Sequence, residues 1–421
     1  MPATAPDSAP PFRDPDRRMH RPCDDRFAAY IEGRGAVAVR IIGPRRTGKT
    51  SLVVAYAARV RAPLLAVTVP PPPADASPTA VFARALDDRI AGLGESSDRK
   101  TVRWYAAYRK LRQRRAGWTD DRTLTGKITA SLGFAGFELG GQRTRKSNAP
   151  ETPGTEGKVH ALAYAATVLD LLDTAAEAVN ERPVVFLDEI QHLFLASART
   201  EADALVWSLR NAMQNHRHCR YVLAGSNRRL FDLLQVGQNA PFLHMGSALE
   251  IPALTAEEID GWALPLLRDL GGRHCRTLAP TAELLCGKIG EIVPVLERLW
   301  ADSRPGDVID EGAQRAAVDQ VIAATDTLDS ALTDLTRTQA ALLRYIVTRP
   351  GAGLYTNEAK AAIAGGSDGT ISTALSALVE RGFVEAYGKT EFRASAPLLA
   401  LAVFSQSAPA APEPKTGRKG R

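Results

Sequence analysis

The feature that most constrains the fold of this chain is a glycine-rich turn between an apolar strand and a helix. Residues 36–42 (AVAVRII) run directly into the octet GPRRTGKT at 43–50, and residues 51–61 have a helical pattern. Strand, GxxxxGK[ST] and helix in this order are the context of a P-loop. The glycines let backbone N–H groups curl around phosphates, and the positive end of the helix dipole faces the same point. The sequence therefore predicts a phosphate-binding loop; the alternative is a glycine turn that binds nothing.

The residues of this loop have different expected roles in binding ATP and Mg²⁺. Lys49 is expected to contact the β- and γ-phosphates, which also makes it a candidate catalytic residue, and the Thr50 hydroxyl is expected to bind Mg²⁺. The candidate nucleotide-binding residues are Gly43, Pro44, Arg45, Arg46, Thr47, Gly48, Lys49, Thr50 and Ser51.

A second apolar run ends in two carboxylates. Residues 184–187 (VVFL) are followed by Asp188 and Glu189. A strand that is apolar on both faces lies inside a parallel sheet, and its end then places the two acids at the carboxyl edge. Asp188 is expected to hold Mg²⁺ through water, and Glu189 to polarise the water that attacks the γ-phosphate. Alone, this pattern also fits a solvated strand end.

A third strand, at 221–224, ends in Gly225, Ser226 and Asn227. Ser226 and Asn227 are candidates for orienting the attacking water beside the γ-phosphate. The alternative is that one of them caps a helix that starts near Arg228.

These segments together resemble the AAA+ ATPase superfamily, and more narrowly its bacterial and archaeal GPRRTGKTSL-type group, which is related to the STAND signalling ATPases. The matching segments are 43–52, 188–191, 224–226 and 240–242, within a stretch of about 24–300. The resemblance implies an α/β fold with a parallel sheet of about five strands, a helical lid and often a C-terminal winged helix. It also implies ATP and Mg²⁺ as cofactors, ATP hydrolysis and a homo-oligomer. The expected strands are 36–42, 64–69, 184–187, 221–224 and 249–251.

Two departures from the family pattern affect the expected mechanism. The segment after Pro241 and Phe242 has no arginine up to Gly246, so Arg228 and Arg229 are the nearest candidates for an arginine finger. The lid has no clear sensor arginine, and residues 290–294 (GEIVP) resemble the GxP-type segment of STAND lids instead. Two functions therefore stay open: an ATPase that acts with nucleic acid, and a nucleotide-gated switch with slow hydrolysis and a protein partner.

A basic insertion separates the two halves of the nucleotide site. Thr50 and Asp188 are 138 positions apart, and residues 99–146 carry thirteen Lys and Arg against three acids, a net charge of +10 in a chain of +6. The first half of the segment has a helical pattern, and residues 127–141 alternate like a small hairpin. The candidate nucleic-acid contacts are Arg109, Arg112, Arg115, Trp104 and Trp118.

Three interpretations of this insertion stay open. Basic residues interleaved with aromatic rings can neutralise phosphates and stack on bases. The same pattern also fits a solvated helix whose rings dock it to the core. An acidic protein partner is the third option.

The C-terminal part has the pattern of a winged helix. Helices are expected at 338–348, 357–364 and 369–381, and a two-stranded wing at 383–394. Residues 330–406 contain seven Lys and Arg against six acids, whereas a DNA-reading domain is usually more basic. DNA contact and packing against a partner are both open for this part.

The expected domain organisation follows from these segments. Residues 1–22 and the basic tail 407–421 are expected to be disordered, 23–252 to form the ATPase core, 253–329 the lid and 330–406 the winged helix. The four cysteines are too sparse for a disulfide scaffold, and no apolar run is long enough to span a bilayer. The N-terminus has no apolar core of a signal peptide, so a cytoplasmic protein without membrane contact is expected.

Overall fold

The computed structural model describes residues 10–401, except 15–16, 34–36, 74–75, 115–154, 196–198, 227–230, 233, 235–239, 244, 325–334, 350–352, 364–366, 388–390 and 399. The chain divides into two compact units. We call residues 20–43 and 49–251 the sheet unit, and residues 1–19, 44–48 and 252–421 the helical unit. The middle of the P-loop, residues 44–48, thus belongs to the helical unit, although its two ends belong to the sheet unit.

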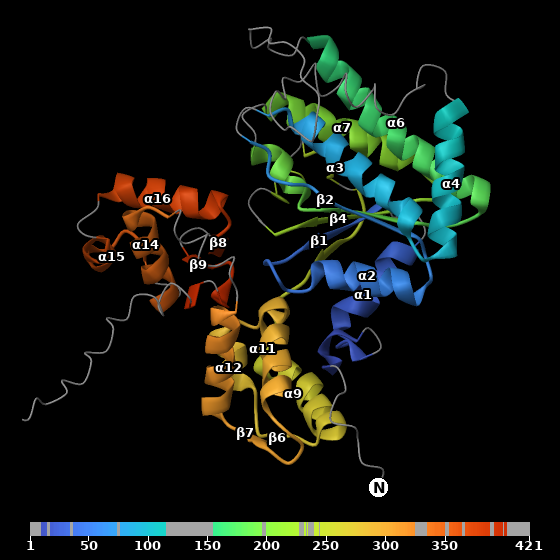
Figure 1. Ribbon diagram of the computed structural model, residues 1–421. Coiled ribbons are helices and arrows are strands. Elements are labelled where there is room, and N and C mark those ends of the chain that lie inside the picture. The colour runs from blue at the N-terminus through green and yellow to red at the C-terminus, as the bar shows by residue number, and fades with distance from the viewer. Residues whose placement is uncertain are drawn as a thin grey trace, which may run out of the picture. The chain divides into compact units, whose positions relative to one another are not determined.

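The sheet unit is built on a five-stranded sheet in the order β2-β3-β4-β1-β5 (Figure 1). All its strand pairs are parallel. The interior strand β3, between β2 and β4, is buried along its whole length, as its unbroken apolar sequence predicts. The expected α/β fold with five parallel strands is therefore confirmed. The strands are β1 (Ala38–Ile42), β2 (Leu64–Thr68), β3 (Val184–Asp188), β4 (Arg220–Gly225) and β5 (Ala248–Glu250).

Helices cover both faces of this sheet (Figure 1). Side chains alternate between the two faces along a strand, so each strand contributes to two cores. On β3, Val185 and Leu187 pack in the core formed with α3, α4, α6 and α7, whereas Val184 and Phe186 pack in the core formed with α1 and α2. The helices are α1 (Pro22–Glu32), α2 (Lys49–Arg59), α3 (Pro78–Gly92), α4 (Arg99–Arg114), α6 (Thr155–Val179) and α7 (Arg199–Asn215), and a 3-10 segment, η4 (Ile190–Leu195), follows β3.

The first part of the helical unit is mainly helical, as the sequence predicts, and its assignment as a lid stays a prediction. Thr255 and Glu258 form a capping box at the start of α9. The lid also contains two features that were not expected: a π-helical turn, η5 (Leu266–Leu270), and a pair of two-residue parallel strands, β6 (His274–Cys275) and β7 (Val308–Ile309). The lid helices are α9 (Ala256–Pro265), α10 (Ala279–Leu284), α11 (Ile289–Asp302) and α12 (Glu311–Ala323).

The described part of the N-terminus is folded, so the expectation of disorder over residues 1–22 was wrong for this part. Residues 11–13 form the 3-10 helix η1 (Pro11–Arg13). Phe12 is buried in the lid core, where its ring meets Trp262 and Trp300 edge to face. Contacts between Phe12 and these two distant rings therefore order a segment whose composition alone indicates disorder.

The C-terminal part follows the expected order of three helices and a hairpin. Ile371 and Leu378 of the third helix are fully buried, as its apolar spacing predicts. The two strands of the hairpin are antiparallel. The assignment of this part as a winged helix stays a prediction. Its elements are α14 (Arg337–Thr348), α15 (Asn357–Ala362), α16 (Asp368–Glu380), β8 (Val384–Tyr387) and β9 (Glu391–Ala394).

None of the helices in the described part of the chain has the length and apolar character needed to cross a membrane.

Candidate nucleotide site

The P-loop connects the end of β1 to the first residue of α2. Gly48 has a φ of 93°, a conformation that side-chain-bearing residues rarely adopt, so this position needs glycine. The side chain of Lys49 turns back across the loop, and its Nζ donates a hydrogen bond of 2.8 Å to the carbonyl oxygen of Gly43. Only 5% of Lys49 is exposed. The lysine is therefore held in the curve of the loop, where the sequence places it.

The structure brings together the two residues predicted to hold Mg²⁺. The hydroxyl of Thr50, in the first turn of α2, donates a 2.9 Å hydrogen bond to Oδ2 of Asp188 at the end of β3. Burial and the neighbouring Glu189 raise the pKa of Asp188, whereas the Thr50 hydroxyl and the positive charge of Lys49 act in the opposite direction. A carboxylate and a hydroxyl are oxygen donors of the kind that Mg²⁺ prefers.

Glu189 is held by three donors on a single oxygen. Its Oε2 accepts hydrogen bonds from the backbone N–H of Ser226 at 3.2 Å and from the Ser226 hydroxyl at 2.8 Å, and a third from Nε2 of Gln191. Burial alone would raise the pKa of Glu189, but Lys49 and the donors from Gln191 and Ser226 outweigh it and lower this pKa. The second carboxylate oxygen, Oε1, has no hydrogen-bond partner among the described residues.

Two side chains beside Glu189 were missed as site residues. Gln191 is fully buried, and its Oε1 has no partner in the described part of the chain. His192 lies with Nδ1 2.8 Å from the Val69 carbonyl oxygen and Nε2 3.9 Å from Oε2 of Glu189. Gln191 closes the segment 188–191 that matches the family pattern, but this match and the position of both residues directly after the acidic pair do not indicate that their side chains turn back towards Glu189.

The residues present fit ATP with Mg²⁺. No group of three or more His, Cys, Asp or Glu that could hold a metal ion occurs within the described ranges. Mg²⁺ in nucleotide sites is usually held by one or two protein oxygens together with the phosphates and water. Thr50 and Asp188 supply that small donor set, and the loop supplies the lysine and backbone N–H groups that phosphates require.

Within the helical unit, the two P-loop arginines contact acids from the lid and the C-terminal hairpin. Arg46 forms an ion pair of 2.6 Å with the buried Glu291 of α11, and the N–H of Gly290 donates to the carbonyl oxygen of Arg46 at 2.9 Å. The backbone N–H of Arg45 donates to Glu385 of β8 at 3.0 Å. Burial raises the pKa of Glu291, and Arg46 opposes this shift. The GxP-type segment that begins at Gly290 therefore lies against the middle of the P-loop.

The segment that precedes β5 is anchored to the sheet by an arginine of β1. Arg40 of β1 donates hydrogen bonds to the carbonyl oxygens of Phe242 at 3.1 Å and Gly246 at 2.9 Å. Phe242 itself is fully buried. The Pro-Phe pair that matches the family pattern thus has a packing role in this chain.

Two of the predicted nucleic-acid contacts on the basic helix α4 were wrong, because their side chains have partners inside the protein. Trp104 is fully buried, and its Nε1 donates to the Leu172 carbonyl oxygen at 2.9 Å, so this ring cannot stack on a base. Arg112 donates to the hydroxyls of Tyr108 and Tyr164, at 3.1 and 3.2 Å, so its guanidinium holds the core together. Arg109 is exposed. Asn227, Arg228, Arg229, Arg115, Trp118 and the expected hairpin at 127–141 lie outside the described residues.

Replacing Trp104 by alanine is expected to lower the free energy of unfolding by about 3–5 kcal/mol, because it removes a large ring from a packed core and leaves a cavity. Thermal or denaturant unfolding measures this effect. Trp207 on α7, which is 38% exposed, offers a matched control whose replacement should change stability little. Equal stability of the Trp104→Ala variant and the wild type would show that the Trp104 ring does not stabilise the core.

The comparisons with known proteins concern the fold. No family model and no curated protein matches the sequence. The chain is similar in structure to a Walker-type ATPase of Pyrococcus abyssi, with 13% sequence identity, a TM-score of 0.54, and coverage of 94% of this chain and 98% of that one. It also matches the ORC2 protein of Aeropyrum pernix at 16% identity and a TM-score of 0.45, covering 94% of this chain and 95% of the other, but a score this low establishes no shared fold. The first likeness and the five-stranded parallel sheet confirm the predicted α/β fold: the chain shares the fold of that Walker-type ATPase.

Proposed function

We propose that this protein is a Mg²⁺-dependent ATPase that couples ATP binding and hydrolysis to a nucleic-acid-associated assembly. The observation that carries the proposal is the arrangement of Lys49, Thr50, Asp188 and Glu189. The first two lie at the start of α2 and the last two at the end of β3, and the 2.9 Å hydrogen bond between Thr50 and Asp188 joins the two elements.

Each residue of the site has its own proposed role in ATP hydrolysis. Bound ATP and Mg²⁺ supply the phosphoanhydride bond and the charge that polarises it. Lys49 would neutralise phosphate charge, and Thr50 and Asp188 are the residues that would hold the metal. Glu189 orients the attacking water and accepts its proton on Oε1, because its Oε2 is already engaged by Ser226 and Gln191. Ser226 therefore acts by orienting Glu189, and Asn227 is a further candidate beside it.

Oligomerisation belongs to the same proposal. Arg228 and Arg229 are the candidates for a finger supplied by a neighbouring copy, since an arginine close to the γ-phosphate stabilises the charge of the transition state.

Nucleic acid is the proposed partner because of the charge of the chain. Residues 99–146 carry a net charge of +10, and the remaining residues sum to −4. Within α4, the exposed cations are Arg99, Arg103, Arg109, Lys110 and Arg114. A surface of this kind attracts a phosphate backbone without reading its sequence. The burial of Trp104 leaves this electrostatic attraction in place and removes that ring from the base-stacking part of the interpretation.

A second function is favoured by a specific observation. Glu291 pairs with the side chain of Arg46, and Glu385 accepts the backbone N–H of Arg45. A nucleotide-gated switch with slow hydrolysis would need such contacts, because they couple the P-loop to the rest of the helical unit. Such a switch would act through a protein partner.

One experiment separates the two functions: ATP hydrolysis by the purified protein measured with and without duplex DNA. Turnover that responds to DNA supports the nucleic-acid-associated ATPase. Retained nucleotide with slow turnover that ignores DNA supports the switch.

A further inference from the structure

Three arginines lie on neighbouring turns at the amino edge of the sheet, which is the edge opposite to the nucleotide site. Arg61, Arg182 and Arg217 precede the first residues of β2, β3 and β4 by three, two and three positions. The turns lie side by side, because the N–H of Val184 donates to the Pro63 carbonyl oxygen at 2.8 Å and the N–H of Arg220 to that of Pro183 at 2.9 Å. All three arginines are exposed.

One of these arginines occupies a backbone conformation that a different residue would adopt more easily. Arg61 follows α2 with a φ of 50°, and the N–H groups of Arg61 and Ala62 donate to the carbonyl oxygens of Ala58 and Ala57. This is a Schellman motif, in which the left-handed position is usually glycine or asparagine. The same motif after α6 has Asn180 at that position. An arginine in a strained backbone position suggests that its side chain serves function, such as binding a partner, and not stability.

Three acids near this edge are bound to other groups, and none of them forms an ion pair with the guanidinium of Arg61, Arg182 or Arg217. Asp173 accepts the backbone N–H groups of residues 217–219, at 2.7 to 3.3 Å. Glu181 pairs with Arg103 at 2.6 Å and with Lys100 at 3.3 Å. Asp170 binds His216 at 2.9 Å. The guanidinium groups of Arg61, Arg182 and Arg217 have no hydrogen-bond or ion-pair partner among the residues that the structure describes.

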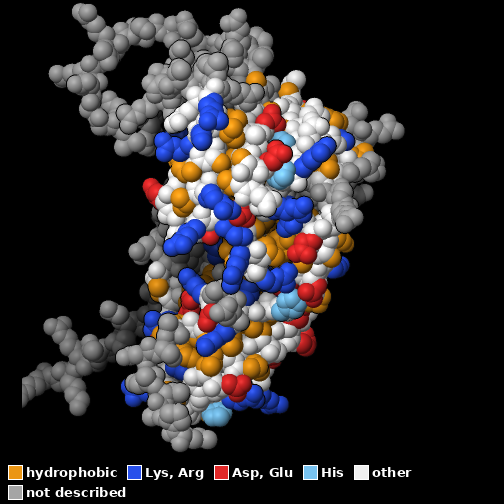
Figure 2. Space-filling model, turned by 90° about the vertical axis from the view of Figure 1, so that its right-hand side faces the viewer, with side chains coloured by type: hydrophobic (Ala, Val, Ile, Leu, Met, Phe, Trp, Pro, Cys, Tyr) orange, Lys and Arg blue, Asp and Glu red, His pale blue; other side chains and the backbone are white. Residues whose placement is uncertain are grey.

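Further basic groups surround these three. Arg220 donates to the Tyr56 hydroxyl at 3.0 Å, and the guanidinium of Arg59 lies 5.7 Å from the centre of the same ring. Figure 2 looks onto the right-hand side of Figure 1, where α4 lies, and shows Lys and Arg side chains gathered in the middle of this face.

We infer that Arg61, Arg182 and Arg217 form a docking surface for the phosphate backbone of duplex nucleic acid. Neighbouring strands lie about 4.8 Å apart, so the three turns span about 10 Å. One strand of B-DNA carries a phosphate about every 3.4 Å along its axis, which places about three phosphates within that span. Guanidinium groups bind phosphate oxygens in pairs and remain charged at any physiological pH. The inference rests on the proposed function for the class of partner, and it adds the sheet edge to the basic insertion as a second contact.

The test measures the binding of the full chain to fluorescently labelled duplex DNA by fluorescence anisotropy, at several salt concentrations. The variant carries Arg61→Glu, Arg182→Glu and Arg217→Glu together. Its matched control carries Arg84→Glu, Arg89→Glu and Arg315→Glu, three exposed arginines on α3 and α12 with the same change in charge. Relative to that control, the variant is expected to bind DNA about 10- to 100-fold more weakly, and the slope of log affinity against log salt should become shallower by about 2.7, or 0.9 for each lost phosphate.

Stability and activity are measured beside binding. ATP hydrolysis without DNA should be the same in the variant and the control, because the three turns lie at the opposite edge from Glu189. Arg61→Asn gives a second, independent readout: it should weaken DNA binding while its melting temperature is equal to or above that of the wild type, because asparagine suits the left-handed position. This single variant keeps the test valid even if the triple variant folds poorly.

The outcomes separate the inference from the proposed function. If the wild type binds DNA and the variant loses no more affinity than its control, the docking surface is wrong and the nucleic-acid function stands. If the wild type binds no duplex DNA at low salt, the nucleic-acid function is wrong and the docking surface falls with it. Loss of affinity confined to the variant, with intact DNA-free hydrolysis, supports both.

Discussion

Replacing Lys49 by alanine is expected to abolish ATP binding and hydrolysis. The Nζ of Lys49 lies 2.8 Å from the Gly43 carbonyl oxygen, inside the curve of the loop, and its positive charge acts to lower the pKa of Asp188 and of Glu189. Alanine removes the charge that would neutralise the β- and γ-phosphates and leaves the backbone of the loop in place. Nucleotide affinity measured by calorimetry or a fluorescent ATP analogue checks this.

A matched control is Lys110→Ala, which removes an exposed lysine on α4 and should leave ATP affinity unchanged. Thermal melting of both variants shows whether the fold survives. Normal ATP affinity in the folded Lys49→Ala variant would show that the phosphates bind somewhere else.

The second large effect is expected from replacing Glu189 by glutamine. Glutamine has the same shape and can keep one oxygen near the donors of Ser226, but it cannot accept the proton of the attacking water. Turnover should fall by about 10²–10⁴-fold. ATP should stay bound, because Glu189 is assigned to the water and not to the phosphates or the metal.

Steady-state hydrolysis and nucleotide affinity, measured on the same preparation, separate these two effects. Glu95→Gln serves as a control because it makes the same change on an exposed residue of the same unit. Turnover that is unchanged in Glu189→Gln would show that another group acts as the base. Loss of ATP binding instead would place Glu189 at the metal or the phosphates.

The sequence predicts the parts of this structure whose signals are local. All five strands lie within two residues of the expected bounds, because an apolar run flanked by turns is a short-range pattern. The P-loop and the acidic strand end are likewise predicted as short motifs. Parallel pairing then brings Thr50 and Asp188 to the same sheet edge although 138 positions separate them.

The parts that were missed depend on partners far along the chain. Phe12 is ordered by Trp262 and Trp300, and Trp104 is buried by Leu172 on α6. A basic, aromatic-rich helix has the same sequence pattern whether its rings face a core or a nucleic acid, so only tertiary contacts decide between these alternatives. The contact between Arg45 and Glu385 crosses 340 positions and has no local signal.

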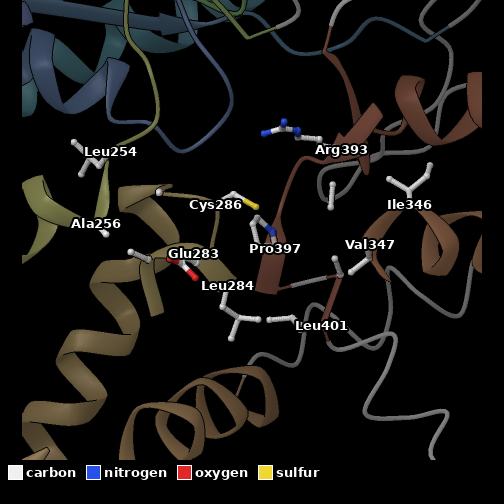
Figure 3. Close-up of a pocket in the computed structure, with 14 residues that line it drawn as sticks. Leu254, Ala256, Glu283, Leu284, Cys286, Ile346, Val347, Arg393, Pro397 and Leu401 are labelled. Carbon is white, nitrogen blue, oxygen red and sulfur yellow. The ribbon is translucent and has the colours of Figure 1, made fainter. Parts of the chain in front are cut away.

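The lining of a cavity in the helical unit illustrates the same limit. This space of about 560 Å³ lies in the helical unit between lid residues such as Leu254 and Cys286 and C-terminal residues such as Ile346 and Leu401 (Figure 3). Its walls come from segments about 150 positions apart, as counted between Leu254 and Leu401. No sequence pattern indicates that these segments meet.

The central claim is that Mg²⁺-dependent ATP hydrolysis at Glu189 is coupled to nucleic acid. The measurement that tests it most directly is the ATPase rate of the purified full chain at low salt, with Mg²⁺ or with a chelator, and with or without duplex DNA. We expect hydrolysis that requires Mg²⁺, changes in rate when DNA is added, and is lost in the Glu189→Gln variant under every condition. A rate that is the same with and without DNA, or that persists in Glu189→Gln, would contradict the account.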